Sequence, residues 1–162
     1  MQPDEDFIIR LAGADDSQIV GSLVCRLLHE LFPDHYSPRN LDALTEAARK
    51  LLRDENGFWV VLAFRKTPDG EGEPVALMSL DEGRALYAYG VMGEIMEFYV
   101  SPECRSTGLG ARLIAFARAF GQERQWSGLE VGAPDVPRWQ RTVDFYLRNG
   151  FSEVGPRLEM SL

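Results

Sequence analysis

The chain has 162 residues, of which 45% are hydrophobic and 26% charged, as is typical of one globular domain. Its formal net charge of −8 argues against a nucleic-acid binder, and no apolar run approaches the ~20 residues of a membrane span. The two cysteines and two histidines lack the spacing of a disulfide framework or a zinc site. We therefore expect one domain over residues 1–162, cytoplasmic and without a metal. The acidic excess maintains solubility or attracts a cationic substrate such as an amine.

The first half of the chain predicts a strand, two helices and further strands. Phe7–Leu11 has the pattern of a strand, and Ile19–Leu31 carries leucines at helical spacing before it ends at Pro33. A second helix is predicted over Asn40–Arg53, because Asn56–Gly57 follows and tolerates the positive φ of a helix end.

The second half alternates strands and helices. The predicted elements are strands Phe58–Phe64, Pro74–Leu80 and Ile95–Val100, a helix from Leu109 to Gly121, strand Leu129–Val131, helix Pro137–Arg148, and strands Phe151–Val154 and Arg157–Leu162. This order predicts an α/β (α+β) domain with a mixed central sheet flanked by about four helices.

The segment with the clearest chemistry joins a strand to a helix. The strand Glu94–Val100 ends near Pro102, and Arg105–Gly110 then opens an amphipathic helix. A strand–loop–helix junction aims free backbone N–H groups and the positive end of a helix at one point, and glycines let the backbone close on an anion. The pattern indicates a pyrophosphate site, with a simple tight turn as the alternative interpretation.

Two other phosphate motifs do not fit this turn. A P-loop needs Lys followed by Ser or Thr after its second glycine, but Ala111–Arg112 follow Gly110. A dinucleotide fingerprint needs a third small residue where Leu113 stands, and too little chain follows Gly108 to build that fold.

Two blocks resemble the GCN5-related N-acetyltransferase (GNAT) signature. Phe98–Pro102 followed by Arg105–Gly110 resembles Y-V-x-P and R/Q-x-x-G-x-G/A, and Phe145–Phe151 matches F-Y-x-x-x-G-F. The resemblance implies a sheet whose two parallel strands splay apart, with acetyl-CoA as acyl donor. The residues that it assigns to the donor are Phe98, Tyr99 and Val100 beside the pantetheine arm, and Arg105, Ser106, Thr107, Gly108, Leu109, Gly110 and Ala111 around the pyrophosphate.

One position departs from the family pattern. The family often carries an asparagine seven places before the tyrosine of the second block, and Trp139 stands there in this chain. We expect Trp139 to pack on the same helix face as Val143 and Tyr146. Gln140 is the alternative source of a side-chain hydrogen bond to the donor.

The chemistry implied by the family needs a base and benefits from an acid. An amine with a pKa near 10.4 is protonated at neutral pH and must lose a proton before it attacks a thioester. Tyr146 matches the tyrosine that the family places near the sulfur, where its phenol can donate to the departing thiolate. Packing alone is the other interpretation of Tyr146.

Glu94 and Glu97 are the candidate bases. Side chains alternate along a strand, so these two fall on opposite faces unless a bulge intervenes. Glu94 stands eleven residues before Arg105, where histone-acetylating members carry their catalytic glutamate, and we favour it narrowly. Glu97 lies closer to the expected acetyl group, and either could instead be a solvated surface carboxylate.

The acceptor and the assembly are less constrained. Asp34, His35 and Tyr36 lie in a loop that resembles the family's variable acceptor-lining segment. A homodimer is suggested by the family and by the terminal strand Arg157–Leu162, whose edge can pair with a second copy. The function predicted is acetyl transfer to a primary amine; a non-catalytic acyl-CoA sensor and an acidic interaction domain are the alternatives.

Overall fold

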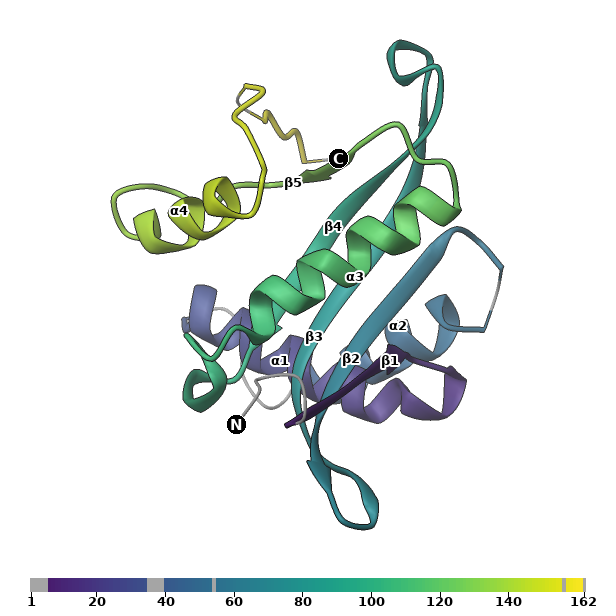
Figure 1. Ribbon diagram of the computed structural model, residues 1–162, viewed down its shortest axis with the longest axis vertical. Coiled ribbons are helices and arrows are strands. Elements are labelled where there is room, and N and C mark those ends of the chain that lie inside the picture. The colour runs from purple at the N-terminus through teal and green to yellow at the C-terminus, as the bar shows by residue number, and fades with distance from the viewer. Residues whose placement is uncertain (1–5, 35–39, 54, 156, 162) are drawn as a thin grey trace.

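A five-stranded mixed sheet organises the computed structural model, which describes residues 6–34, 40–53, 55–155 and 157–161. The strands lie in the order β1-β2-β3-β4-β5, and every pair is antiparallel except β4 with β5 (Figure 1). The elements are β1 (Phe7–Leu11), α1 (Ser17–Leu31), α2 (Leu41–Leu51), β2 (Phe58–Thr67), β3 (Gly70–Ala85), β4 (Gly90–Val100), α3 (Leu109–Glu123), β5 (Leu129–Val131) and α4 (Gln140–Arg148), with short 3-10 turns at Ala14–Asp16, Leu86–Ala88 and Pro102–Cys104. The predicted mixed sheet with four helices is confirmed. None of the described helices is long and apolar enough to cross a membrane.

Helices cover the sheet on both sides. Figure 1 shows α3 in front of the sheet and α1 and α2 behind it. The side chains of the central strands alternate between the two resulting cores: Val61 and Met78 point to the side of α3, whereas Leu62 and Leu77 point to the side of α1. All four are fully buried, which explains why β2 and β3 read as continuous apolar runs in the sequence. We call these two sides of the sheet the α3 face and the α1 face.

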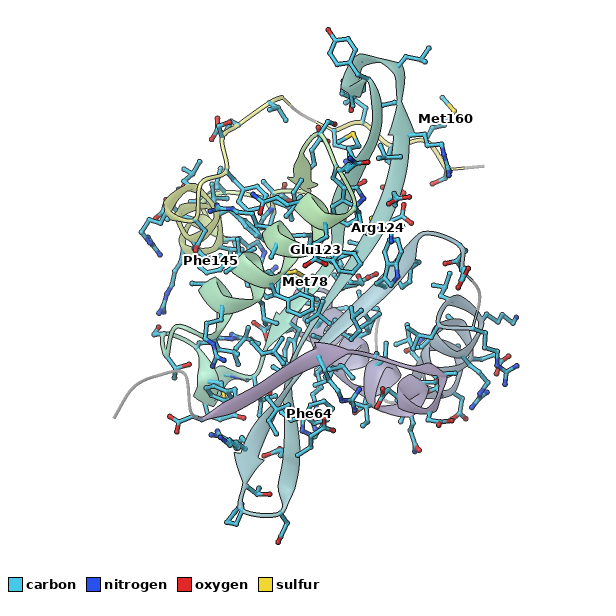
Figure 2. The ribbon with its side chains drawn as sticks, turned by 45° about the vertical axis from the view of Figure 1, so that its right-hand side comes forward. Phe64, Met78, Glu123, Arg124, Phe145 and Met160 are labelled. Carbon is cyan, nitrogen blue, oxygen red and sulfur yellow. The ribbon has the colours of Figure 1, made fainter. Side chains whose placement is uncertain are left out.

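Trp126 fixes the end of α3 against the sheet. Its indole packs on Gly93 of β4 and on Gly121 of α3, where no Cβ occupies the space. Its ring nitrogen donates a hydrogen bond of 2.7 Å to Glu82, which also accepts from Arg124. Arg124, labelled in Figure 2, lies 4.0 Å from the ring centroid of Trp59. This cluster holds α3 and β4 together just before the chain enters β5.

β4 carries an extra residue in its middle. Met78 of β3 is paired with Phe98, whereas Leu80, two residues further on, is paired with Ile95, three residues back. One residue of β3, Ser79, therefore opposes two of β4, Met96 and Glu97, which is a β-bulge between Ile95 and Phe98.

The two parallel strands pair over a short stretch and then separate. β5 pairs with Gly93, Glu94 and Ile95 only, and the chain leaves the sheet after Val131. Pro134 follows three residues later and has no N–H with which to continue the ladder. Along residues 96–100, the edge of β4 that faces away from β3 has no strand partner among the described residues, and Figure 1 shows β5 diverging there towards α4. The predicted splay is confirmed.

The predicted strands Phe151–Val154 and Arg157–Leu162 are wrong over the described residues. Residues 151–155 and 157–161 have no regular secondary structure, and Leu162 lies outside the described part. An alternating pattern becomes a strand only where a partner edge is present, and β5 offers only three residues. Val154, Leu158 and Met160 are instead strongly exposed, and Figure 2 shows Met160 far from the core.

Candidate active site

The turn between β4 and α3 leaves the first N–H groups of α3 available. Ser106 and Gly108 adopt left-handed backbone angles, with φ of 64° and 91°. Gly108 is the N-cap of α3, and no side chain there caps the helix. The first N–H groups of an α-helix have no acceptor within the helix, so in this turn they remain for an anion. A Cβ added at Gly108 would meet no atom within 4 Å, which places open space directly in front of the turn.

Gly110 serves a different purpose from Gly108. A Cβ at Gly110 would stand 3.1 Å from the ring of Phe145, which comes from α4 and lies beside α3 (Figure 2). Phe145 in turn packs against Phe98 of β4, with ring centroids 5.9 Å apart. The absence of a side chain at Gly110 therefore lets α4 approach the start of α3.

Arg105 points away from the open side of the turn. Its Nε donates to the carbonyl oxygen of Val100 at 2.8 Å, and its guanidinium forms a 2.7 Å ion pair with Glu30 of α1. The hydrogen bond that Arg105 donates to the Glu30 carboxylate raises the pKa of Arg105. In this arrangement Arg105 ties the turn to the end of β4 and to α1.

A second arginine reaches the turn from α4, and sequence reasoning missed it. Arg141 donates a hydrogen bond of 2.8 Å to the hydroxyl of Ser106. The two residues are 35 positions apart, and no local pattern joins them. The one partial signal was that α4 overlaps the second family block, Phe145–Phe151, which does not include Arg141 itself.

Tyr146 lies in an aromatic environment on α4. It is 8% exposed, and its ring centroid lies 5.4 Å from that of Phe151 and 6.4 Å from that of Phe98. Burial raises its pKa to about 12. Its hydroxyl makes no hydrogen bond with another described residue, which leaves the O–H free to donate to a ligand.

The bulge places Glu94 and Glu97 on the same face of the sheet. Ile95 and Phe98 both point to the α3 face, so the residue before each of them points to the α1 face. Without the bulge, two residues three apart would face opposite ways. The sequence analysis allowed a bulge as the exception to this alternation, and β4 contains that bulge.

The two glutamates have different partners. The carboxylate of Glu97 accepts a hydrogen bond from Ser79 of β3, while that of Glu94 pairs with Arg157 of the C-terminal segment. Hydrogen bonding to Glu94 is the main reason why the pKa of Arg157 is raised, and the charge of Glu130 adds to it.

Further carboxylates adjoin Glu94 on the α1 face. Asp81 of β3 and Glu130 of β5 are the register partners of Glu94 on either side. Like charges directly opposite each other in a sheet repel. The row therefore gives this part of the α1 face a negative potential. No three acidic, histidine or cysteine side chains in the described ranges come close enough together to hold a metal ion.

The structure also describes Asp34, Trp139 and Gln140, which the sequence analysis named. Asp34 is exposed just after α1, and His35 and Tyr36 lie outside the described residues. Trp139 is half-buried at the start of α4, with the guanidinium of Arg138 5.0 Å from its ring centroid. Gln140 is exposed and donates to Asp144 at 2.9 Å.

A wide groove of about 1200 Å³ runs between α3, β5, α4 and the C-terminal segment. Tyr146, Ile114, Val131 and Arg157 are among its lining residues, but no residue of the turn 105–111 is. Tyr146 therefore belongs to the wall of this groove.

Comparisons with known proteins agree with this fold. Residues 22–151 match the model of the acetyltransferase (GNAT) family. The chain is 29% identical over 156 residues to an aminoalkylphosphonate N-acetyltransferase from Salmonella typhimurium, covering 95% of this chain and 90% of that protein. Among solved structures, an aminoglycoside acetyltransferase from an uncultured soil metagenomic sample superposes with a TM-score of 0.77 at 21% identity over 99% of each chain. A ribosomal-protein-alanine N-acetyltransferase from Brucella melitensis biovar Abortus 2308 gives 0.72 at 20% identity, over 96% of this chain and 99% of that one.

Proposed function

The chain belongs to the acetyltransferase (GNAT) family, and we propose that it moves an acetyl group from acetyl-CoA to a cationic primary amine in a ternary complex, with Glu97 as base and Tyr146 as acid. It is an acyltransferase, and the family uses acetyl-CoA as cosubstrate. The observation that carries the proposal is the turn before α3, where an uncapped helix start faces open space.

The pyrophosphate is assigned to the residues from Ser106 to Ala111. The backbone N–H groups at the start of α3 and the positive end of the helix dipole favour two phosphates at this point. Arg141 adds a full positive charge beside Ser106. Arg105 contributes by holding the turn to Val100 and Glu30.

The pantetheine arm is assigned to the edge of β4. Residues 96–100 present backbone N–H and C=O groups on the side where β5 has departed. An extended amide-containing chain can hydrogen-bond to such an edge as an added strand would. This path leads from the turn towards the bulge, where Glu97 stands.

Acetyl transfer then proceeds by direct attack. The amine nitrogen, once deprotonated through Glu97, forms a bond with the thioester carbonyl carbon, and the carbon–sulfur bond breaks. The ammonium loses one proton to Glu97, directly or through a water, before the attack. The second proton leaves the nitrogen as the amide forms and replaces, through water, the proton that Tyr146 gives to the departing sulfur. Because its pKa is about 12, the Tyr146 hydroxyl stays protonated throughout the neutral range and is always ready to donate.

Glu97 is a better candidate for the base than Glu94, which the sequence favoured narrowly. Glu97 lies within the bulge region, next to the free edge of β4, and its partner Ser79 is neutral. Glu94 is paired with β5 and with the guanidinium of Arg157, which competes for the lone pairs that a base needs. Glu94 is better suited to attracting a cationic acceptor.

The acidic α1 face favours acceptors that carry several positive charges. Asp81, Glu94 and Glu130 form a row beside Glu97, and such a row concentrates cations in front of the base. A polyamine-like or aminoglycoside-like molecule fits this potential. An aminoalkylphosphonate, the substrate class in the name of the Salmonella protein, carries a negative phosphonate that the row would repel.

Calorimetric titration of acetyl-CoA tests the donor site. Wild type is expected to bind, and Gly108→Glu to lose binding, because the added carboxylate fills the space that the phosphates need. Gly70→Glu is the matched control: Gly70 also has a positive φ, of 117°, and open space around it, but lies in the β2–β3 turn. Binding by Gly70→Glu and not by Gly108→Glu supports the site, whereas equal binding by both rejects it.

A thiol-release assay tests the reaction. The acceptor panel contains an aminoglycoside, a linear polyamine, an aminoalkylphosphonate and a peptide with an N-terminal alanine. We expect release with the first two. Binding of acetyl-CoA without release under any acceptor would favour the acyl-CoA sensor instead.

A further inference from the structure

Ser79 is one of the few polar side chains in the core, and it lies opposite the bulge of β4. It is 1% exposed and belongs to β3, where its neighbours Leu77, Met78 and Leu80 are wholly buried apolar residues. Its register partner on the other side is the apolar Val60 of β2. A buried hydroxyl in such surroundings costs free energy unless both its donor and its acceptor capacity are used.

Both capacities are directed at one residue. The hydroxyl oxygen of Ser79 accepts the backbone N–H of Glu97 at 2.9 Å, and the hydroxyl also donates to Oε2 of the Glu97 carboxylate. A serine has a single O–H. The N–H of Glu97 occupies one acceptor position of the Ser79 oxygen, so the hydroxyl hydrogen points to its other partner, the Glu97 carboxylate. The hydroxyl is thereby committed to the carboxylate.

The bulge explains why a side chain is needed at this position. An extra residue in β4 interrupts the ladder with β3, so a backbone N–H in the bulge loses its usual carbonyl acceptor. The Ser79 hydroxyl takes the place of that carbonyl. The Ser79 hydroxyl therefore holds both the backbone of the bulge and the carboxylate of Glu97.

We propose that Ser79 is a positioning residue for the reaction: it fixes the bulge and aims the Glu97 carboxylate at the acceptor amine. The inference rests on the proposed function, in which Glu97 is the base. Ser79 itself touches neither substrate, because only 1% of it is exposed.

A pair of isosteric variants isolates the hydroxyl. Ser79→Thr keeps the O–H and Ser79→Val has the same shape without it, so a difference between the two cannot come from volume. With the fastest acceptor of the panel, we expect Ser79→Val and Ser79→Ala to lower kcat about 10- to 100-fold, as small misplacements of a reacting group do. Ser79→Thr should retain most of the wild-type kcat. The KM for acetyl-CoA should stay within about twofold in all three, because the turn before α3 is untouched.

Glu97→Gln and the double variant Ser79→Ala/Glu97→Gln complete the test. If Ser79 acts through Glu97, the double variant is no slower than Glu97→Gln alone. Wild-type kcat in Glu97→Gln would reject the base, and the inference with it. A slow Glu97→Gln beside fully active Ser79→Ala and Ser79→Val would reject the inference and leave the base intact. If Ser79→Val and Ser79→Thr both lose acetyl-CoA binding, the role of Ser79 is merely structural, and this outcome also rejects the inference.

Discussion

Arg141 of α4 donates a hydrogen bond of 2.8 Å to the hydroxyl of Ser106, in the turn that precedes α3. Ser106 has a left-handed φ of 64° and lies two residues before Gly108, the N-cap of α3. The contact brings the positive charge of Arg141, on α4, to the N-terminus of α3. An anion in front of α3 would therefore meet both.

Arg141→Gln is expected to weaken acetyl-CoA binding roughly five- to tenfold, since one charge-assisted contact to a phosphate is lost at an exposed site. Titration calorimetry at low and high salt measures the effect, which should shrink as salt screens the charge. Arg148→Gln, at the exposed end of the same helix, is the control and should bind as wild type does. Equal affinities for both variants would remove Arg141 from the donor site.

Because the Tyr146 hydroxyl is buried, we expect the protein to lose stability in alkali. Its pKa is raised by burial from 10.0 to about 12 in the folded protein. Below pH 10 the residue is neutral in both states. Between pH 10 and 12 the unfolded chain loses this proton while the folded protein keeps it, so the free energy of unfolding falls as pH rises, by about 2–3 kcal/mol over the window.

Urea denaturation between pH 9 and 11.5 tests this expectation in wild type and Tyr146→Phe. The variant has no hydroxyl to titrate, so its free energy of unfolding should decline less steeply than that of wild type. Tyr87→Phe, which removes an exposed hydroxyl, should follow the wild-type slope. Parallel slopes for wild type and Tyr146→Phe would show that the hydroxyl is not buried as described.

Gly93→Ala should destabilise the junction of α3 with the sheet. A Cβ at this position would overlap the six-membered ring of Trp126, which is also confined by Gly121. We expect the free energy of unfolding to fall by about 1–3 kcal/mol, the usual effect of overpacking. Gly83→Ala is the control on the neighbouring strand, because its Cβ would come no closer than 4.0 Å to Met92. Chemical denaturation compares the two, and similar losses would argue against a specific clash.

Arg157→Gln should improve the use of a polycationic acceptor. Arg157 is 62% exposed and pairs with Glu94, so it contributes little to stability but neutralises part of the acidic row. Removing its charge is expected to lower the KM for the acceptor a fewfold and to leave the KM for acetyl-CoA unchanged. Thiol-release kinetics with an aminoglycoside measure both constants. An unchanged or higher acceptor KM would place the acceptor away from Glu94.

The fold and the glycine-marked turn before α3 could be predicted from the sequence because their signals are local. Apolar periodicity located four helices and the strands of the sheet, and Gly108 and Gly110 marked the start of α3. Each glycine proved to be required for a separate reason: a positive φ at Gly108, and the approach of Phe145 at Gly110. These signals act within a few residues or one helix face, so they can be read without knowing what lies nearby.

The arrangement of the candidate catalytic groups was decided by the tertiary structure. Glu94 and Glu97 share a face because β4 bulges, and the residue that meets the bulge, Ser79, is 18 positions away on β3. Arg141 reaches the turn, and Arg105 leaves it for Glu30, through contacts that no spacing reveals. The C-terminal segment alternates like a strand but lacks an edge of sufficient length to pair with. Strand register, bulges and ion pairs depend on which segments meet in space, so the sequence determined the elements and the fold determined what they bring together.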